Sequence, residues 1–274
     1  MLPAIVRAAH PGPSVVVTAV AVLLGIGVGL EPWRIVVLGV ATALDQCSVG
    51  LSNDWIDAER DRAAGRRDKP IARGELGVPL VRAIAIAAGI AALLATIPLG
   101  WAALVAHAVM LASAWSYNAG LKRTAASVVP FVVSFGLVPV MVTLALPSPA
   151  MPVWWSVLAG ALLGTAAHLA NALPDADDDR RTGVLGLPHR LPRPVAVVVT
   201  WAALLGAALA LAGGLGFAGP LPIVALLVNG AIAAAGLALS LRSPSRWGFR
   251  LVLLAALVDV ALLLLAGPRL VADP

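Results

Sequence analysis

Long apolar runs alternate with short polar segments along the whole chain. Nine runs have roughly the 17–25 residues that an α-helix needs to cross the hydrocarbon of a bilayer. They cover about 13–30, 33–56, 78–99, 101–117, 125–146, 152–173, 194–216, 220–241 and 249–267. We therefore predict an all-α, polytopic membrane protein with nine transmembrane helices around a central cavity.

The composition supports this interpretation and excludes an ordinary soluble domain. Hydrophobic residues make up 60% of the 274 residues, charged residues 12%, and the mean hydropathy is +0.95. Soluble domains carry about 25% charged residues. The single cysteine, Cys47, falls inside the second run and excludes an intramolecular disulfide.

The placement of the basic residues predicts the orientation in the membrane. They follow the second, fourth, sixth and eighth runs, which with nine spans all lie on one side. Short cytoplasmic loops are rich in Lys and Arg, so we expect this face to be cytoplasmic and the protein to be integral to the plasma membrane. Because the net charge of +5 is explained in this way, we expect membrane lipid as a partner and no nucleic acid.

One polar pattern occurs twice, each time at the end of an apolar run. Asn53, Asp57 and Asp61 are spaced by four residues, and Asn171, Asp175 and Asp179 repeat the spacing. The repeat suggests duplication of a four-helix unit, at about 13–123 and 125–241, with a ninth helix at about 249–267, all within one membrane domain.

Residues four apart on a helix share a face, so each copy presents one amide and two carboxylates to the same side. These are hard oxygen ligands that suit Mg²⁺, which keeps coordination positions for water and phosphate. Glu59 and Asp177 point away and are interpreted as solvated acids. Dense acids and bases at one mouth of an apolar bundle fit a ligand with a diphosphate head and a hydrocarbon tail.

Three segments together resemble the UbiA-type intramembrane prenyltransferases. Asn53-Asp54-Trp55-Ile56-Asp57-Ala58-Glu59-Arg60-Asp61, followed by Lys69-Pro70, looks like the family's first aspartate motif and the basic residue and proline downstream. Asp175 to Gly183 looks like the second aspartate motif, and Tyr117 to Arg123 resembles the tyrosine-then-basic segment after the fourth helix. One departure is Lys69, where the family usually has arginine. The charge is kept and the bidentate fork is lost.

The resemblance implies Mg²⁺-dependent transfer of a prenyl group from a polyprenyl diphosphate to a hydrophobic acceptor of unknown identity. It implies that Asp57, Asp61, Asp175 and Asp179 are the catalytic metal ligands. The residues implied to bind substrate are Asn53, Asn171, Arg67, Lys69, Tyr117, Lys122 and Arg123.

Alternatives remain at this point. A UbiA-type terpene cyclase, or transfer of a prenyl phosphate to a sugar phosphate, would use the same fold. A cation transporter would use intramembrane carboxylates as a relay, near the bilayer midplane and on broken helices. Six polar residues inside the runs either line an acceptor pocket or satisfy one another between helices. They are Asp45, Gln46, His107, His168, Asn229 and Asp259.

Overall fold

Prolines mark the starts of several long helices. In the computed structural model, which describes residues 1–66, 69–172, 183–217, 219–242 and 246–272, α2 (Pro11–Gly27), α3 (Pro32–Ile56), α5 (Val78–Thr96) and α11 (Arg193–Gly214) have a proline in their first two positions. Proline suits this place because the first N–H groups of a helix have no intrahelical partner. The prolines therefore mark where these four helices begin.

The other long helices are α6 (Trp101–Ala119), α7 (Val129–Leu144), α8 (Trp154–Ala172), α12 (Pro220–Arg242) and α13 (Arg246–Ala266). Short helices are α1 (Leu2–Ala8), α4 (Ala58–Ala63) and α10 (Leu187–Arg190). Four 3₁₀ segments are η1 (Ile97–Leu99), η2 (Leu121–Arg123), η3 (Ala125–Val128) and η4 (Gly267–Leu270). Within the described residues, one isolated bridge between Pro152 and Val271 accompanies the helices.

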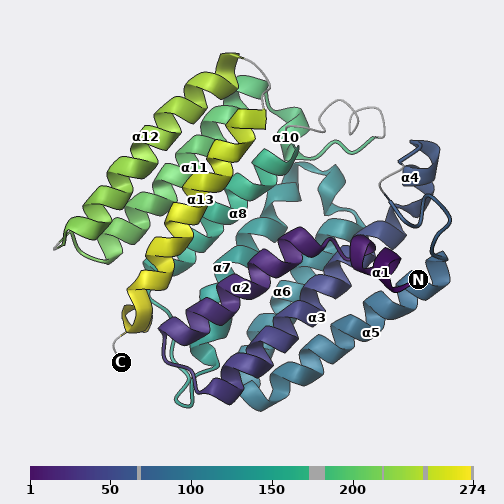
Figure 1. Cartoon of the computed structure of the whole chain (residues 1–274), viewed down its shortest axis with the longest axis horizontal. Coiled ribbons are helices and arrows are strands. Elements are labelled where there is room, and N and C mark those ends of the chain that lie inside the picture. The colour runs from purple at the N-terminus through teal and green to yellow at the C-terminus, as the bar shows by residue number, and fades with distance from the viewer. Residues whose placement is uncertain (67–68, 173–182, 218, 243–245, 273–274) are drawn as a thin grey trace.

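The long helices pack side by side in a closed series (Figure 1). α2 packs on α3, α3 on α5 and α6, α6 on α7, α7 on α8, α8 on α11, and α11 on α12 and α13. α13 returns to α2 and closes the series. The C-terminal segment then lies beside the start of α8, where the Val153 N–H donates to the Leu270 carbonyl at 2.8 Å.

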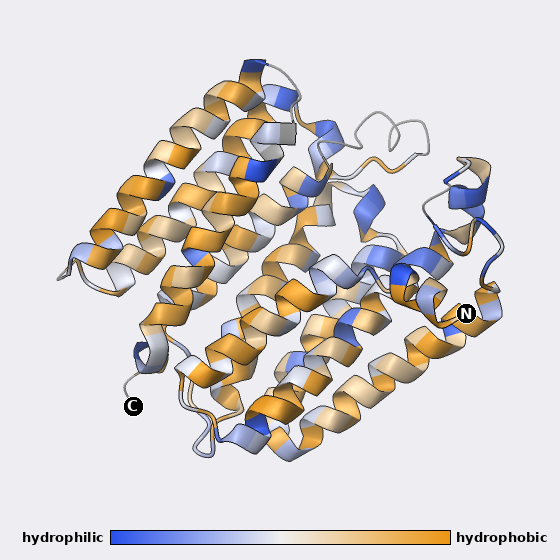
Figure 2. Ribbon diagram, viewed as in Figure 1, coloured by the Kyte–Doolittle hydropathy of each residue, from blue (hydrophilic) through white to orange (hydrophobic). Residues whose placement is uncertain are grey.

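The surface of the bundle is apolar. Hydrophobic residues run along the long helices, and hydrophilic residues concentrate around α4 and the turns (Figure 2). Many large side chains on the outside are half exposed or more, such as Ile90, Leu94, Leu227 and Leu257. A soluble protein rarely exposes so much apolar surface, and with the long apolar helices this surface shows an integral membrane protein.

The all-α fold is confirmed, and the long helices lie close to the predicted runs. Nine helices in the described residues have 16 residues or more. Among the described residues, six helical spans are long and apolar enough to cross a membrane, or seven if α1 and α2, which meet at a 69° bend, count as one. The number of nine membrane spans therefore stays a prediction, as does the four-helix duplication.

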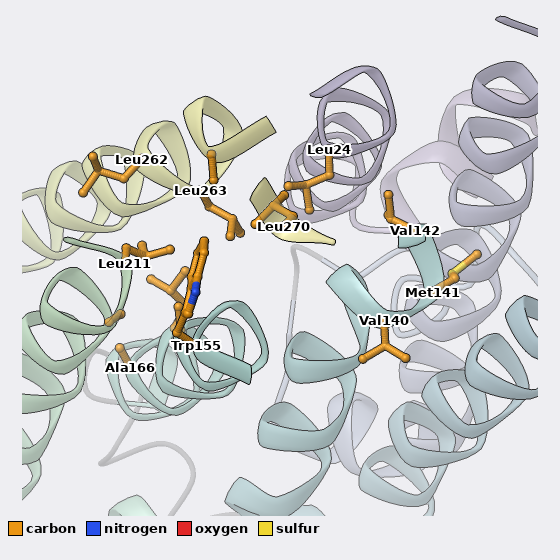
Figure 3. Packing of buried hydrophobic residues seen from close by; sticks show 14 of the residues in the cluster. Leu24, Val140, Met141, Val142, Trp155, Ala166, Leu211, Leu262, Leu263 and Leu270 are labelled. Atoms are coloured by element: carbon orange, nitrogen blue, oxygen red, sulfur yellow. The ribbon is translucent and has the colours of Figure 1, made fainter. Parts of the chain in front are cut away.

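The main core fills the space between the helices (Figure 3). Trp155 of α8 is 7% exposed and lies close to Leu211 of α11 and Leu263 of α13. Lipid tails are as apolar as these side chains, so helix association depends on close packing and on hydrogen bonds between helices. Close packing is most evident where α8 presents Gly160 and Gly164, because a methyl group on either would collide with the Phe135 or Phe131 carbonyl of α7.

Hydrogen bonds hold α3 against its neighbours near its C-terminal end. The Ser48 hydroxyl donates to the Ala85 carbonyl of α5 at 2.7 Å and accepts from the Trp115 indole of α6 at 3.1 Å. One turn further on, the Asn118 amide of α6 donates to the Ser52 hydroxyl at 2.8 Å. These bonds fix the end of α3 that carries the first aspartate motif.

Two short helices at this end were not predicted. The runs of apolar residues suggested a polar loop directly after Ile56, and α4 instead follows after the single residue Asp57. α1 has only seven residues, too few to register as an apolar run. It packs through Ala4 and Ala8 on a second, smaller core cluster with Leu51, Ile71 and Leu76.

Candidate active site

The first aspartate motif lies where α3 bends into α4. The Asp57 N–H bonds to the Asn53 carbonyl at 3.1 Å, and the Asp61 N–H bonds to the Asp57 carbonyl at 2.8 Å. The helical hydrogen-bond ladder therefore continues through the bend and keeps Asn53, Asp57 and Asp61 on one side. Asp57 and Asp61 are 2% and 3% exposed, while Glu59 is exposed, as the helical period predicts.

Lys122 reaches this motif from η2, which directly follows α6. Its Nζ lies 2.5 Å from Asp57 Oδ2 and 3.2 Å from Asn53 Oδ1. The side chain is 4% exposed. Burial lowers the pKa of Lys122 from its usual range, and the neighbouring Asp57 carboxylate opposes that shift by favouring the charged ammonium.

A second cation comes from α4 itself. Arg60 Nη2 donates to Asp57 Oδ2 at 2.9 Å and to Asp61 Oδ1 at 3.2 Å, so it bridges the two carboxylates. Asp57 Oδ2 thus accepts from both cations. Asp57 Oδ1 is buried and has no hydrogen-bond partner among the described residues.

The donor set of this motif fits a hard divalent cation such as Mg²⁺. It offers one amide oxygen and two carboxylates, of which Asp57 has the unpartnered Oδ1. In the described part of the chain, no three His, Cys, Asp or Glu side chains come together as a metal-binding group. The predicted metal ligands Asp175 and Asp179, like Arg67, lie outside the described residues.

A cavity of about 90 Å³ adjoins Lys122. Its lining comes from the end of α6, the end of α8 and the segment around α10. The lining residues are Tyr117, Lys122, His168, Asn171, Ala172, Val184, Gly186, Pro188 and His189. The cavity therefore brings three predicted substrate-binding residues, Tyr117, Lys122 and Asn171, to one place.

Aromatic rings form one wall of this region. The Tyr117 ring meets Phe131 edge-on at a centroid distance of 5.2 Å and meets His168 edge-on at 5.9 Å. His168 Nε2 forms a hydrogen bond of 2.9 Å with the Ser127 hydroxyl, which also accepts from the Leu187 N–H at 2.8 Å. Ser127 thereby ties the segment over the cavity to α8.

Lys69 makes contacts away from the Asn53–Asp57 oxygens. Its Nζ lies 2.5 Å from Asp54 Oδ1 and 3.0 Å from His10 Nε2, and His10 Nε2 lies 2.8 Å from the same Asp54 oxygen. Asp54 is 2% exposed. The group joins the start of α2, the end of α3 and the loop before α5.

Arg123, the remaining predicted residue, is exposed at the end of η2. Sequence reasoning assigned no role to Arg60, Asp54, His10 or Ser127. Arg60 had a local signal, because a residue three positions after Asp57 lies on the same helical face. The contacts of His10 and Ser127 join residues 44 and 41 positions apart, and no short-range pattern indicates them.

Most polar residues inside the helices bond to one another, although Asp45, Asn229 and Asp259 each keep one buried oxygen without a partner among the described residues. Asp45 accepts from Gln46 at 2.9 Å and lies 3.6 Å from His107, whose Nδ1 bonds to Thr96 at 2.7 Å. The Asn229 amide of α12 donates to Asp259 of α13 at 2.6 Å. Of the six in-span residues considered, His168 lines the cavity.

Comparison with known proteins identifies the family. The profile of the UbiA prenyltransferase family matches residues 14–258. The chain therefore belongs to the UbiA prenyltransferase family. No curated protein matches the chain in sequence.

Solved structures share the fold over nearly the whole chain. A UbiA homologue from Archaeoglobus fulgidus bound to DMAPP and Mg²⁺ is 16% identical, with a TM-score of 0.71 over 96% of this chain and 99% of that one. An apo UbiA homologue from Aeropyrum pernix K1 is 17% identical, with a TM-score of 0.71 over 96% and 97%. A digeranylgeranylglyceryl phosphate synthase is 14% identical, with a TM-score of 0.69 over 98% of both chains.

The Asp54 group makes a first prediction. Asp54→Asn removes the charge that Lys69 and His10 contact, while it keeps the size of the side chain. We expect the free energy of unfolding to fall by about 1.5–3 kcal/mol, the usual contribution of a hydrogen bond to a charged group. Thermal unfolding in detergent measures the change, with Glu59→Gln as the matched control at an exposed acid. Equal stability of the two variants would contradict the structural role of Asp54.

Proposed function

We propose that this protein transfers a prenyl group from a polyprenyl diphosphate to a lipophilic or aromatic acceptor within the membrane, with Mg²⁺ as cofactor. The proposal depends above all on the convergence of Asn53, Asp57 and Lys122 beside a cavity with an aromatic wall. UbiA homologues of the same fold from Archaeoglobus fulgidus were solved with DMAPP or GPP and Mg²⁺. They support a prenyl diphosphate as the donor here.

The acidic residues would hold the metal and the basic residues the diphosphate. Bound Mg²⁺ would neutralise charge on the leaving diphosphate. Asp57 and Asp61 would be ligands together with Asp175 and Asp179, with support from the amides of Asn53 and Asn171. This assignment uses the unpartnered Asp57 Oδ1 and the burial of both first-motif carboxylates.

Lys122 and Arg123 would contact the diphosphate oxygens through charge-assisted hydrogen bonds, which are about twice as strong as neutral ones. Arg67 and Lys69 are proposed as further contacts. Lys69 would have to exchange its contact with Asp54 for one with phosphate.

The aromatic wall suits the other end of the reacting bond. Departure of diphosphate from an allylic carbon leaves positive charge on the prenyl group. The faces of aromatic rings attract cations within about 6 Å. Tyr117 lines the cavity together with Lys122, and Phe131 packs against Tyr117. Tyr117 would therefore face the allylic carbon while the basic residues hold the departing group.

The transporter alternative has less support. A carboxylate relay needs acids near the middle of the membrane. The in-span acids Asp45 and Asp259 are each bonded to a neighbouring amide, from Gln46 and Asn229. Asp57 and Asp61 lie after the end of α3, at the junction with α4 and within α4, beside two basic side chains.

The decisive experiment incubates the purified protein in lipid with prenyl diphosphates and a panel of lipophilic and aromatic acceptors. We expect diphosphate release and a prenylated acceptor by mass spectrometry, with both abolished by excess chelator and restored by Mg²⁺. Full turnover in chelator would refute the metal requirement. A hydrocarbon product without acceptor would favour the cyclase, and cation flux in proteoliposomes without diphosphate release would favour the transporter.

The facing direction of the first motif predicts unequal effects of two similar substitutions. Asp57→Asn removes a buried charge that faces Lys122 and should lower kcat/KM by about 10²-fold or more, the scale seen for loss of one electrostatic group in an active site. Glu59→Gln removes an exposed charge two residues away and should leave the rate within about threefold. Both variants need intact expression and size-exclusion profiles. Equal losses of activity would indicate that the total negative charge of this segment matters, and not the direction in which each carboxylate faces.

The charge distribution supports a plasma-membrane protein with its active mouth in the cytoplasm. A single cysteine in place of Glu59, in a Cys47→Ala background, should resist an impermeant thiol reagent in intact cells and react after permeabilisation. Labelling of intact cells would reverse the proposed orientation.

A further inference from the structure

Three oxygens of the first motif, Asn53 Oδ1, Asp57 Oδ2 and Asp61 Oδ1, are already in contact with cations of the chain itself. Lys122 Nζ lies between Asn53 Oδ1 and Asp57 Oδ2, and Arg60 bridges Asp57 and Asp61. Among the described residues, the two carboxylates and two cations make this group electrically neutral. Such pairing is required at a buried site, because an uncompensated carboxylate away from water is costly.

This neutrality has a consequence for ligand binding. A divalent cation that arrived alone would add two positive charges next to Lys122 and Arg60, and like charges this close repel one another strongly at low dielectric. A diphosphate supplies negative oxygens that accept the displaced cations. Bound metal should therefore raise the affinity for diphosphate, and bound diphosphate the affinity for metal.

We propose that Lys122 is an internal counterion that occupies the Asn53–Asp57 oxygens in the ligand-free protein and transfers to the diphosphate when donor and metal bind. Divalent metal and prenyl diphosphate then bind with positive cooperativity, and by linkage each raises the affinity of the other by the same factor. The inference rests on the proposed function. It adds that the charge of Lys122 couples the binding of metal to the binding of donor.

Lys122 is better suited than Arg60 to this exchange. Arg60 lies on α4, within three residues of both carboxylates, and bridges them through one nitrogen, Nη2. Lys122 approaches from η2 on a flexible stem of four methylenes and also lines the 90 Å³ cavity. Its ammonium has three donors, so it can leave Asn53 and Asp57 for phosphate oxygens on the cavity side.

The test measures Mn²⁺ affinity of the purified full-length protein from the paramagnetic resonance signal of free Mn²⁺. It is done with and without the unreactive donor analogue geranyl S-thiolodiphosphate. In the natural sequence the analogue should raise Mn²⁺ affinity by about tenfold or more, within the usual range of coupling between sites. In Lys122→Met the affinity without analogue should rise by about tenfold, and the coupling should fall to about threefold or less.

Arg73→Met is the control, because it removes a positive charge whose partner, Glu75, lies outside the Asn53–Asp57–Asp61 set. Its Mn²⁺ affinity without analogue should equal that of the natural sequence. Lys122→Arg keeps the charge and should keep the affinity low. If Lys122→Met is unstable, Mn²⁺ alone should raise its unfolding temperature more than that of the natural protein, because the metal replaces the lost counterion.

Equal analogue-free Mn²⁺ affinity in the natural protein and Lys122→Met, with no extra thermal stabilisation by Mn²⁺, would overturn the counterion role. Tighter Mn²⁺ binding in Arg73→Met as well would also overturn it, because any lost basic charge would then suffice. If the analogue bound neither protein, the proposed donor would be wrong. The analogue-free comparison would still decide the role of Lys122.

Discussion

Buried carboxylates at the end of an apolar bundle must be paired with cations, and this constraint organises the functional end of the molecule. Asp57 contacts Lys122 from the turn after α6. Asp54 contacts Lys69 from the loop before α5 and His10 from the start of α2. Three segments that are distant in sequence thus converge on two residues of one helical turn. The neighbouring hydrogen bonds of Ser48 and Ser52 hold that turn of α3 in place.

The sequence predicted the parts of this structure that depend on local periodicity. Apolar run length located the long helices, because only a continuous helix satisfies the backbone in lipid. The four-residue spacing correctly placed Asp57 and Asp61 on a buried face and Glu59 on the exposed one. α1 and α4 were not predicted, because helices of seven and six residues are too short to show a helical period of apolar residues.

Contacts between distant segments were harder to predict. Lys122 was assigned to the site through a family resemblance alone, and its contact with Asp57 spans 65 positions. The Lys69–Asp54–His10 group had no sequence signal, since any of several basic residues in the loop might have paired with Asp54. The same holds inside the membrane, where the sequence left open whether Asn229 and Asp259 line a pocket, and the fold pairs them.

The glycines of α8 bring this helix into direct backbone contact with α7. Gly160 and Gly164 bring the backbone of α8 against the Phe135 and Phe131 carbonyls of α7, with no side chain between them to change rotamer. Two backbones in direct contact cannot slide past each other without losing that fit. α7 and α8 therefore act as one rigid body, which carries Phe131, His168 and Asn171 together. The segment that carries α10 is joined to this body by side-chain hydrogen bonds of the Ser127 hydroxyl rather than by backbone packing.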